Sequence, residues 1–192
     1  GPLFLADTTV NFNPTAEELA EITLLVAKEV KQFNIKPRIA MLSYSNFGSS
    51  DSPEANLVSK AREIIKQKDP SLICDGEVQG ILAFNKEILK ENYPFTELLN
   101  GEVNILIFPN LSAGNIAYNL LQEVGGTDSI GPILLGLNKP VHVLQLGSSI
   151  RAIFNMVLIA VVDAQTKCKT NTKEVIKKSK WWKRKKNIAQ EM

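Results

Sequence analysis

Short apolar runs alternate with helical patterns along most of the chain. Short continuous apolar runs are typical of strands that are buried on both faces of a sheet. They predict strands at Leu3–Ala6, Arg38–Leu42, Leu72–Cys74, Asn104–Phe108, Ile133–Leu137 and Val141–Leu146. Between these runs, apolar residues recur at helical spacing after residues that favour helix starts.

Helices are therefore predicted between the strands. The first follows Thr15 and Glu18, which form a capping-box pattern, and should end near Phe33–Asn34. The second begins at Ser52–Pro53 and ends near Lys68, since serine caps helices and proline favours their first turn. Further helices are expected after Gln79 to about Glu91, from Ser112 to Val124, and from Ser149 to Gln165.

This alternation predicts an α/β fold with a mostly parallel sheet flanked by helices. Ligands of such sheets bind at the carboxyl ends of the strands. Four polar or glycine-containing loops are expected there: Ser43–Ser50, Asp75–Gln79, Pro109–Asn115 and Gly147–Arg151. The last helix is apolar nearly all round, which is typical of a helix that is buried or at an interface, and this favours an oligomer.

Composition narrows the class of protein. The 192 residues are 44% hydrophobic and 22% charged, as in an ordinary globular protein. The apolar start, Leu3–Ala6, is too short for a signal peptide, and no apolar run reaches the roughly 20 residues of a membrane span. Cys74 and Cys168 do not make a disulfide framework, which favours a cytoplasmic protein. The single histidine, His142, excludes a histidine-rich metal site, and its apolar surroundings favour a strand histidine over the base of a catalytic triad.

The net charge of +2 conceals an asymmetry. Residues 1–165 carry 12 basic and 18 acidic residues, whereas residues 166–192 carry 10 basic and 2 acidic residues. The basic extension includes Trp181 and Trp182, and such a segment could bind nucleic acid or an anionic membrane surface. The acidic body and the lack of a recognition motif instead favour a solvated extension whose tryptophans dock on the body or on a neighbouring subunit. Neither nucleic acid nor a membrane is an expected partner.

Two of the loops that follow a strand contain residues that could bind a ligand or act in catalysis. Ser43–Ser50 offers backbone N–H groups and four serine hydroxyls before a helix start, which suits a phosphate or a carboxylate, although an ordinary turn explains it equally well. No Gly-Lys-Ser/Thr segment of a Walker loop occurs. Asp75 and Glu77 could act in acid–base chemistry or bind a cation. An N-cap and first-turn role in the next helix is the favoured explanation.

The other two loops lie at helix starts. Asn110 and Asn115 flank one start, and helix capping explains them as well as ligand binding does. Ser149 opens the last helix beside Arg151, which is the only cation in these four loops. The Ser149 hydroxyl could bind an anion or cap the helix.

Taken together, the loops resemble the phosphate acetyl/butyryl transferase family. The resemblance rests on an ordered set of motifs at Phe4–Asn11, Pro14–Glu17, Met41–Ser49, Cys74–Gln79, Ile107–Leu111, Gly114–Asn115, Gly131–Gly136 and Lys139–Val141. It implies an isocitrate/isopropylmalate dehydrogenase-like (phosphotransacetylase) architecture. Residues 1–146 would form the second domain of this architecture. Residues 147–165 would form a closing helix that packs towards a missing first domain, and residues 166–192 would be a basic extension outside the family.

The resemblance also implies that the family's catalytic positions are altered. Active members have an arginine and an aspartate in and after a Ser-Arg-Gly segment, and the corresponding positions here are Leu146 and Ala152. Phe47 stands where many active members have a lysine. Leucine cannot stabilise the charge of an acyl phosphate, and alanine cannot accept a proton. Neither a catalytic residue nor a metal ligand is therefore expected in this chain.

The segments Leu5–Asn11, Ser45–Ser49 and Gly147–Arg151 further resemble the C-terminal phosphotransacetylase-like domain of bacterial NADP-dependent malic enzymes. That branch implies a regulatory domain of a longer polypeptide that oxidatively decarboxylates malate to pyruvate. NADP and Mg or Mn would bind the upstream malic enzyme domain, with no cofactor in this chain. The chain would bind acetyl-CoA, or a related acyl-CoA or acyl phosphate, and support a homo-oligomer, a dimer or higher.

The expected ligand-binding residues are Ser43, Ser45, Asn46, Gly48, Ser49, Asn110, Asn115, Ser149 and Arg151. The alternative is a phosphate acetyltransferase with an altered active site, which would interconvert acetyl-CoA and phosphate with acetyl phosphate and CoA.

Overall fold

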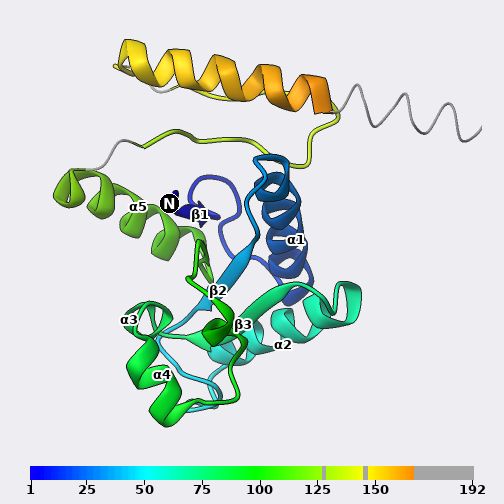
Figure 1. Ribbon diagram of the computed structural model, residues 1–192, viewed down its shortest axis with the longest axis vertical. Helices are drawn as coiled ribbons and strands as arrows, with labels where there is room; N and C mark the ends of the chain where they lie inside the picture. Colours follow the sequence, from blue (N-terminus) through cyan, green and yellow to red (C-terminus); the bar gives the residue numbers. More distant parts are fainter. Residues whose placement is uncertain (127–128, 145–146, 167–192) are drawn as a thin grey trace, which may run out of the picture. The chain divides into compact units, whose positions relative to one another are not determined.

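The structure of the protein is a computed structural model that describes residues 1–126, 129–144 and 147–166 (Figure 1). Its contacts divide the chain into two units, Gly1–Asp128 and Ser129–Met192, which are taken one at a time. Among the described residues, no helix is both long and apolar enough to cross a membrane. The domain boundaries expected after residues 146 and 165 stay a prediction.

A parallel four-stranded sheet forms the centre of the first unit. Across the sheet the strands are β1 (Phe4–Ala6), β4 (Ile105–Ile107), β2 (Arg38–Leu42) and β3 (Ile73–Val78). Every neighbouring pair is parallel, so the carboxyl ends of the strands meet at one edge. The predicted α/β fold, with a mostly parallel sheet flanked by helices, is confirmed.

Three strand predictions were wrong. β3 continues to Val78 instead of ending at Cys74, because the acidic residues after Cys74 find buried partners inside the unit. The predicted strands Ile133–Leu137 and Val141–Leu146 are not formed in residues 129–144, and Leu146 lies outside the described residues. Gly136, with a φ of 81°, and Pro140, which has no N–H to donate, interrupt this stretch. His142 is therefore not a strand histidine.

Three long helices begin where their capping residues predict. Thr15 and Glu18 form the capping box of α1 (Ala16–Gln32), with distances of 3.2 and 2.8 Å. The Ser52 hydroxyl caps α2 (Pro53–Lys68), and the Asn110 side chain caps α5 (Leu111–Gly125). Their ends also lie close to the predicted ones, which confirms these three elements.

The single helix predicted after Gln79 is instead two short ones. α3 (Gly80–Ala83) ends before Asn85, and α4 (Lys86–Asn92) begins after it. The Asn85 side chain accepts a hydrogen bond from the Ile88 N–H at 3.1 Å and so starts a new helix. A 3₁₀ helix, η1 (Glu97–Asn100), then leads into β4.

Helices cover both faces of the sheet (Figure 1). α1 and α2 pack against each other and on one side of the strands. On the other face, Ala40 and Leu42 of β2 and Leu106 of β4 share one buried cluster with residues of α3, α4 and η1, against which residues of α5 also pack. Because side chains alternate along a strand, Ile39, Met41 and Ile105 face the α1–α2 side.

The second unit contains a helix over residues 150–166. The Ser149 hydroxyl accepts a hydrogen bond from the Ala152 N–H at 3.1 Å, so Ser149 is the N-cap of this helix. Its apolar residues are exposed on several sides, including Ile150, Phe154 and Val157. This exposure agrees with the sequence pattern that led us to expect an interface, and the oligomer itself stays a prediction.

Gly114 lies where α5 meets the chain just after β1. A Cβ atom at Gly114 would lie 2.1 Å from the carbonyl oxygen of Asp7. Two hydrogen bonds hold this approach: Leu111 N–H to Phe12 O at 3.0 Å, and Asn115 Nδ2 to Thr8 O at 3.2 Å. The helix can approach the β1–α1 loop this closely only because residue 114 has no side chain.

Gly114→Ala should therefore destabilise the first unit by about 1–3 kcal/mol, the usual cost of overpacking against a rigid backbone. The matched control is Gly80→Ala in α3, where an added Cβ meets nothing within 4 Å. Denaturant unfolding of both variants measures the difference. Equal midpoints for Gly114→Ala and Gly80→Ala would contradict the close approach of α5 to Asp7.

Candidate functional site

The serine side chains of the β2–α2 loop are engaged within the protein. Ser45 is 1% exposed, and its Oγ lies 3.0 Å from Glu77 Oε1 and 3.1 Å from Ser49 Oγ. Ser49 Oγ also accepts from the Asn46 N–H at 2.9 Å, and Ser43 Oγ accepts from the Ser45 N–H at 3.2 Å. These hydroxyls hold the loop together, which is the turn interpretation that the sequence left open.

The end of β3 shapes this loop. Glu77 Oε1 accepts from the Gly48 N–H at 2.6 Å, and the Glu77 carbonyl accepts from the Phe47 N–H at 2.8 Å. Asn46 Oδ1 accepts from the Gln79 N–H at 2.8 Å. Phe47 and Gly48 have φ values of 47° and 87°, a left-handed conformation that is unfavourable for phenylalanine. Hydrogen bonds to Glu77 therefore fix the strained part of the loop.

Glu77 is itself almost completely buried, with 1% of its surface exposed. Its Oε2 atom has no hydrogen-bond partner within the described part of the chain, and no ion pair found there includes Glu77. A carboxylate held in this way is costly, because its desolvation is only partly offset by the two donors on Oε1. The loop therefore encloses an acidic side chain, one oxygen of which has no partner among the described residues.

Asp75 has a structural role as well. It is 2% exposed and accepts hydrogen bonds from Thr96 Oγ1 at 2.7 Å and the Glu97 N–H at 3.0 Å. Arg62 Nε of α2 lies 3.2 Å from Asp75 Oδ1 and forms an ion pair with it. The favoured explanation of Asp75 and Glu77 as helix-capping acids was wrong, because both lie within β3 and tie it to its neighbours.

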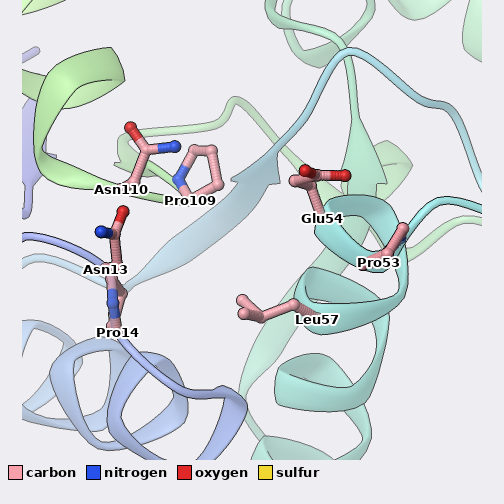
Figure 2. Close-up of a pocket in the computed structure, with 7 residues that line it drawn as sticks. All are labelled: Asn13, Pro14, Pro53, Glu54, Leu57, Pro109 and Asn110. Carbon is pink, nitrogen blue, oxygen red and sulfur yellow. The ribbon is translucent and has the colours of Figure 1, made fainter.

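A pocket opens at the carboxyl edge of the sheet (Figure 2). Its walls come from the β1–α1 loop, the first turns of α2 and the turn between β4 and α5. The lining residues are Asn13, Pro14, Pro53, Glu54, Leu57, Pro109 and Asn110. In Figure 2 the Leu57 side chain points from α2 towards Asn13 and Pro14. Asn110 is fixed by its capping role, since its Oδ1 accepts from the Ala113 N–H at 2.9 Å.

The chemistry of this lining is mainly uncharged. Three prolines and Leu57 supply apolar surface, and two asparagine amides supply donors and acceptors. Glu54 is the charged residue of the lining, which contains no lysine or arginine. Such a surface suits an uncharged ligand group that carries methylenes and amides better than it suits a phosphate.

The β1–α1 loop that carries Asn13 is held by Asp7. Burial alone would raise the pKa of Asp7, but hydrogen bonds from the backbone N–H groups of Thr9, Asn11 and Val10 outweigh it. The pKa therefore lies below its usual value. The Asn11 side chain adds a further hydrogen bond at 2.6 Å. A lowered pKa keeps Asp7 ionised at neutral pH, so the loop stays ordered at one side of the pocket.

Of the nine residues predicted to bind a ligand, Asn110 lines this pocket. Ser43, Ser45, Asn46, Gly48 and Ser49 form the β2–α2 loop instead. Asn115 donates to Thr8 O, while Ser149 and Arg151 belong to the second unit. The ligand-binding roles of all nine residues stay a prediction.

Sequence reasoning missed the other pocket residues. Asn13–Pro14 and Pro109–Asn110 each stand just before a helix at the carboxyl edge, and this repeated asparagine–proline pairing is the signal that was available. Glu54 and Leu57 gave no signal beyond the helix pattern. Within the described residues, no group of three or more histidine, cysteine or acidic side chains is placed to hold a metal ion.

The parallel sheet with helices on both faces defines the first unit as an α/β domain. Residues 1–161 match the model of the family described as phosphate acetyl/butaryl transferase, and the chain belongs to this family. A phosphotransacetylase structure from Streptococcus pyogenes superposes with a TM-score of 0.79 at 43% identity, over 84% of this chain and 49% of that one.

Two groups of relatives are similar in sequence. The chain is 50% identical over 165 residues to an NADP-dependent malic enzyme of Haemophilus influenzae, which covers 86% of the chain and 22% of the relative. It is 41% identical over 159 residues to a phosphate acetyltransferase of Bacillus subtilis, which covers 83% of the chain and 49% of the relative. The chain thus spans about a fifth of the first relative and about half of the second.

The role of Glu77 in the loop can be tested with two substitutions. Glu77→Ala removes the acceptor for Gly48 and Ser45 and should cost at least about 2 kcal/mol of unfolding free energy. Glu77→Gln keeps an acceptor oxygen on a side chain of nearly the same shape, so its loss should be smaller, below about 1 kcal/mol.

Denaturant unfolding measures both variants, and Glu63→Ala on the exposed side of α2 is the matched control, expected within about 0.5 kcal/mol of the unmodified chain. If Glu77→Gln were as damaging as Glu77→Ala, the negative charge and not the acceptor would hold the loop.

Proposed function

We propose that this chain is the phosphotransacetylase-like regulatory part of an NADP-dependent malic enzyme, and that it binds acetyl-CoA or a related acyl ligand without transferring the acyl group. The observation that carries this proposal is the 50% identity to a malic enzyme, against 41% to a phosphate acetyltransferase over a similar length. The malic enzyme relative is also several times longer than the matched segment, which leaves room for a separate catalytic domain.

The residue at one altered catalytic position supports a role without acyl transfer. Ala152 stands at the position of the family's aspartate, and its side chain is a methyl group in the first turn of the second unit's helix. A methyl group cannot deprotonate the thiol of CoA. The other altered position, Leu146, lies outside the described residues.

The pocket supports the binding of an uncharged ligand arm. Acetyl-CoA carries two amides along its thioester arm, and the lining of Asn13, Asn110, Leu57 and three prolines is complementary to these amides and to the methylenes between them. The phosphates of the ligand would need a cation from elsewhere, and Arg151 is the residue that we assign to them. Binding of the ligand to this chain would change malate turnover because the ligand site and the malate site would be coupled in free energy.

In this proposal the upstream malic enzyme domain binds NADP and Mg or Mn, and this chain binds neither. The exposed apolar residues of helix 150–166 would lie in a homo-oligomer interface, a dimer or higher. We place the protein in the cytoplasm, where its thiols stay reduced. Cys74 agrees with this, since burial raises its pKa to about 12 and so keeps it a neutral, unreactive thiol.

The test is malate-dependent NADPH formation by the full-length gene product with and without acetyl-CoA. Acetyl-CoA should change turnover, and both Asn13→Ala and Arg151→Ala should raise the half-effective concentration about 3- to 10-fold, the worth of one hydrogen bond to a ligand. Turnover without acetyl-CoA should not change. Asn100→Ala is the control, because Asn100 is exposed on η1 at the opposite edge of the sheet.

A phosphate acetyltransferase with an altered active site is the second candidate, favoured by the TM-score of 0.79 to a phosphotransacetylase. The same protein preparation decides between the two. Formation of acetyl-CoA from acetyl phosphate and CoA above the protein-free rate, with no malate turnover, would replace our proposal with this one. Malate turnover that ignores acetyl-CoA would remove the regulatory role.

A further inference from the structure

An asparagine–glycine pair, Asn100–Gly101, stands at the end of η1, and this dipeptide occurs once in the sequence. An asparagine before glycine can lose its side-chain amide, because glycine has no side chain to hinder attack by its backbone nitrogen on the amide carbon. Asn100 is exposed, and its side chain makes no hydrogen bond with another described residue. The amide is therefore accessible to the neighbouring nitrogen and to water.

The backbone of Gly101 is also free to react. Within the described ranges its N–H donates no hydrogen bond, so a base can remove the proton without breaking one. Its φ of 141° is one that residues with a side chain rarely adopt. A Cβ atom here would lie 2.2 Å from Nε of Arg38. The fold therefore requires a glycine directly after Asn100.

Two comparable pairs in the same unit each lack one of these features. Asn92 is exposed at the end of α4, but the next residue is Tyr93, whose N–H donates to the Leu89 carbonyl at 2.8 Å. Asp75 precedes Gly76, but it is 2% exposed and both of its carboxyl oxygens accept hydrogen bonds. Of the three pairs, the one at the end of η1 combines an exposed side chain with an unhindered nitrogen.

We propose that Asn100 is a site of spontaneous deamidation in the folded protein, with water as the co-reactant. The Gly101 nitrogen loses its proton and attacks Cγ of Asn100. The bond from Cγ to Nδ2 then breaks, and Nδ2 takes up a proton and leaves as ammonia, which closes a succinimide ring. Water opens the ring at either carbonyl. Opening at Cγ gives aspartate, and opening at the main-chain carbonyl gives isoaspartate, in which the main chain runs through Cγ.

Isoaspartate at this position would strain the first unit, because the chain is fixed on both sides of it. Before it, the Glu97 N–H donates to Asp75 at 3.0 Å. After it, the Asn104 N–H donates to the Arg38 carbonyl at 3.0 Å, and Asn104 Oδ1 accepts from the Arg38 N–H at 2.8 Å. An additional backbone carbon between these points must displace one of them. Aspartate keeps the length of the main chain and should be tolerated better.

The test is to incubate the folded full-length gene product in buffers of neutral to mildly alkaline pH. Mass spectrometry of its peptides detects the replacement of the amide NH₂ by OH, and fragmentation assigns the change to a residue. Asn100 should deamidate at least about tenfold faster than Asn92, which is equally exposed but precedes a side chain and a bonded N–H. The rate at Asn100 should rise with hydroxide concentration, since the attacking nitrogen must lose its proton.

Two variants separate this chemistry from general ageing of the protein. Asn100→Gln keeps an amide but needs a larger ring for the attack, so it should abolish the isoaspartate that a specific methyltransferase labels. Asn92→Gln, at the other exposed helix end, is the matched control and should leave that label unchanged. After incubation, the unmodified protein should unfold at a lower denaturant concentration than before, and Asn100→Gln should not.

Equal rates at Asn100 and Asn92 in the folded protein would overturn the proposal. So would an isoaspartate label that persists in Asn100→Gln, or deamidation of Asn100 that occurs in denaturant and not in buffer. An incubated protein that carries isoaspartate at residue 100 and unfolds at its original midpoint would reject the strain between η1 and β4.

Discussion

The buried carboxylate of Glu77 is the interaction on which the carboxyl edge of the sheet depends. It lies within β3, and it binds the loop that leaves the neighbouring strand β2. Without an acceptor at this position, the Gly48 N–H and the Ser45 hydroxyl would be buried and unsatisfied, which costs about 1–3 kcal/mol per group. The loop in turn leads into the N-terminus of α2, whose first turns form one wall of the pocket. A single side chain thus connects sheet, loop and pocket wall.

This arrangement changes what the serine-rich loop can do. Its hydroxyls look like an anion cradle in the sequence, but they are used to fold the loop around an acidic group. A phosphate close to Glu77 would meet an acidic group that has no ion-pair partner among the described residues, so no cation there favours its binding. The neighbouring pocket is also free of lysine and arginine, and its charged residue is acidic. Both surfaces therefore favour uncharged or cationic groups over phosphates.

Much of the fold could be predicted from local signals, whereas the site could not. Thr15, Ser52 and Asn110 mark helix starts because each caps a helix within three residues of itself, which a sequence shows directly. Glu77, the partner that ties Ser45 to β3, is 32 residues away from it, and no local pattern indicates this pairing. The predictions of strands near Leu137 and Val141 were wrong for a related reason. Apolar residues indicate that a segment is buried, but a strand also needs a neighbouring strand to pair with. Gly136 and Pro140 interrupt the backbone of this stretch.

The same physical reasoning separates binding from catalysis in this family. Acyl transfer needs a group, such as a fixed cation, whose interaction with the acyl phosphate strengthens as charge develops there. It also needs a base that deprotonates the thiol of CoA. Apolar contacts and amide hydrogen bonds to a ligand arm are as strong before the reaction as during it, so they provide affinity without acceleration. In our proposal, a chain with Ala152 at the family's aspartate position and a pocket lined mainly by proline, leucine and asparagine would keep the second kind of interaction. That combination is what an effector site requires, because an effector must bind reversibly and leave unchanged.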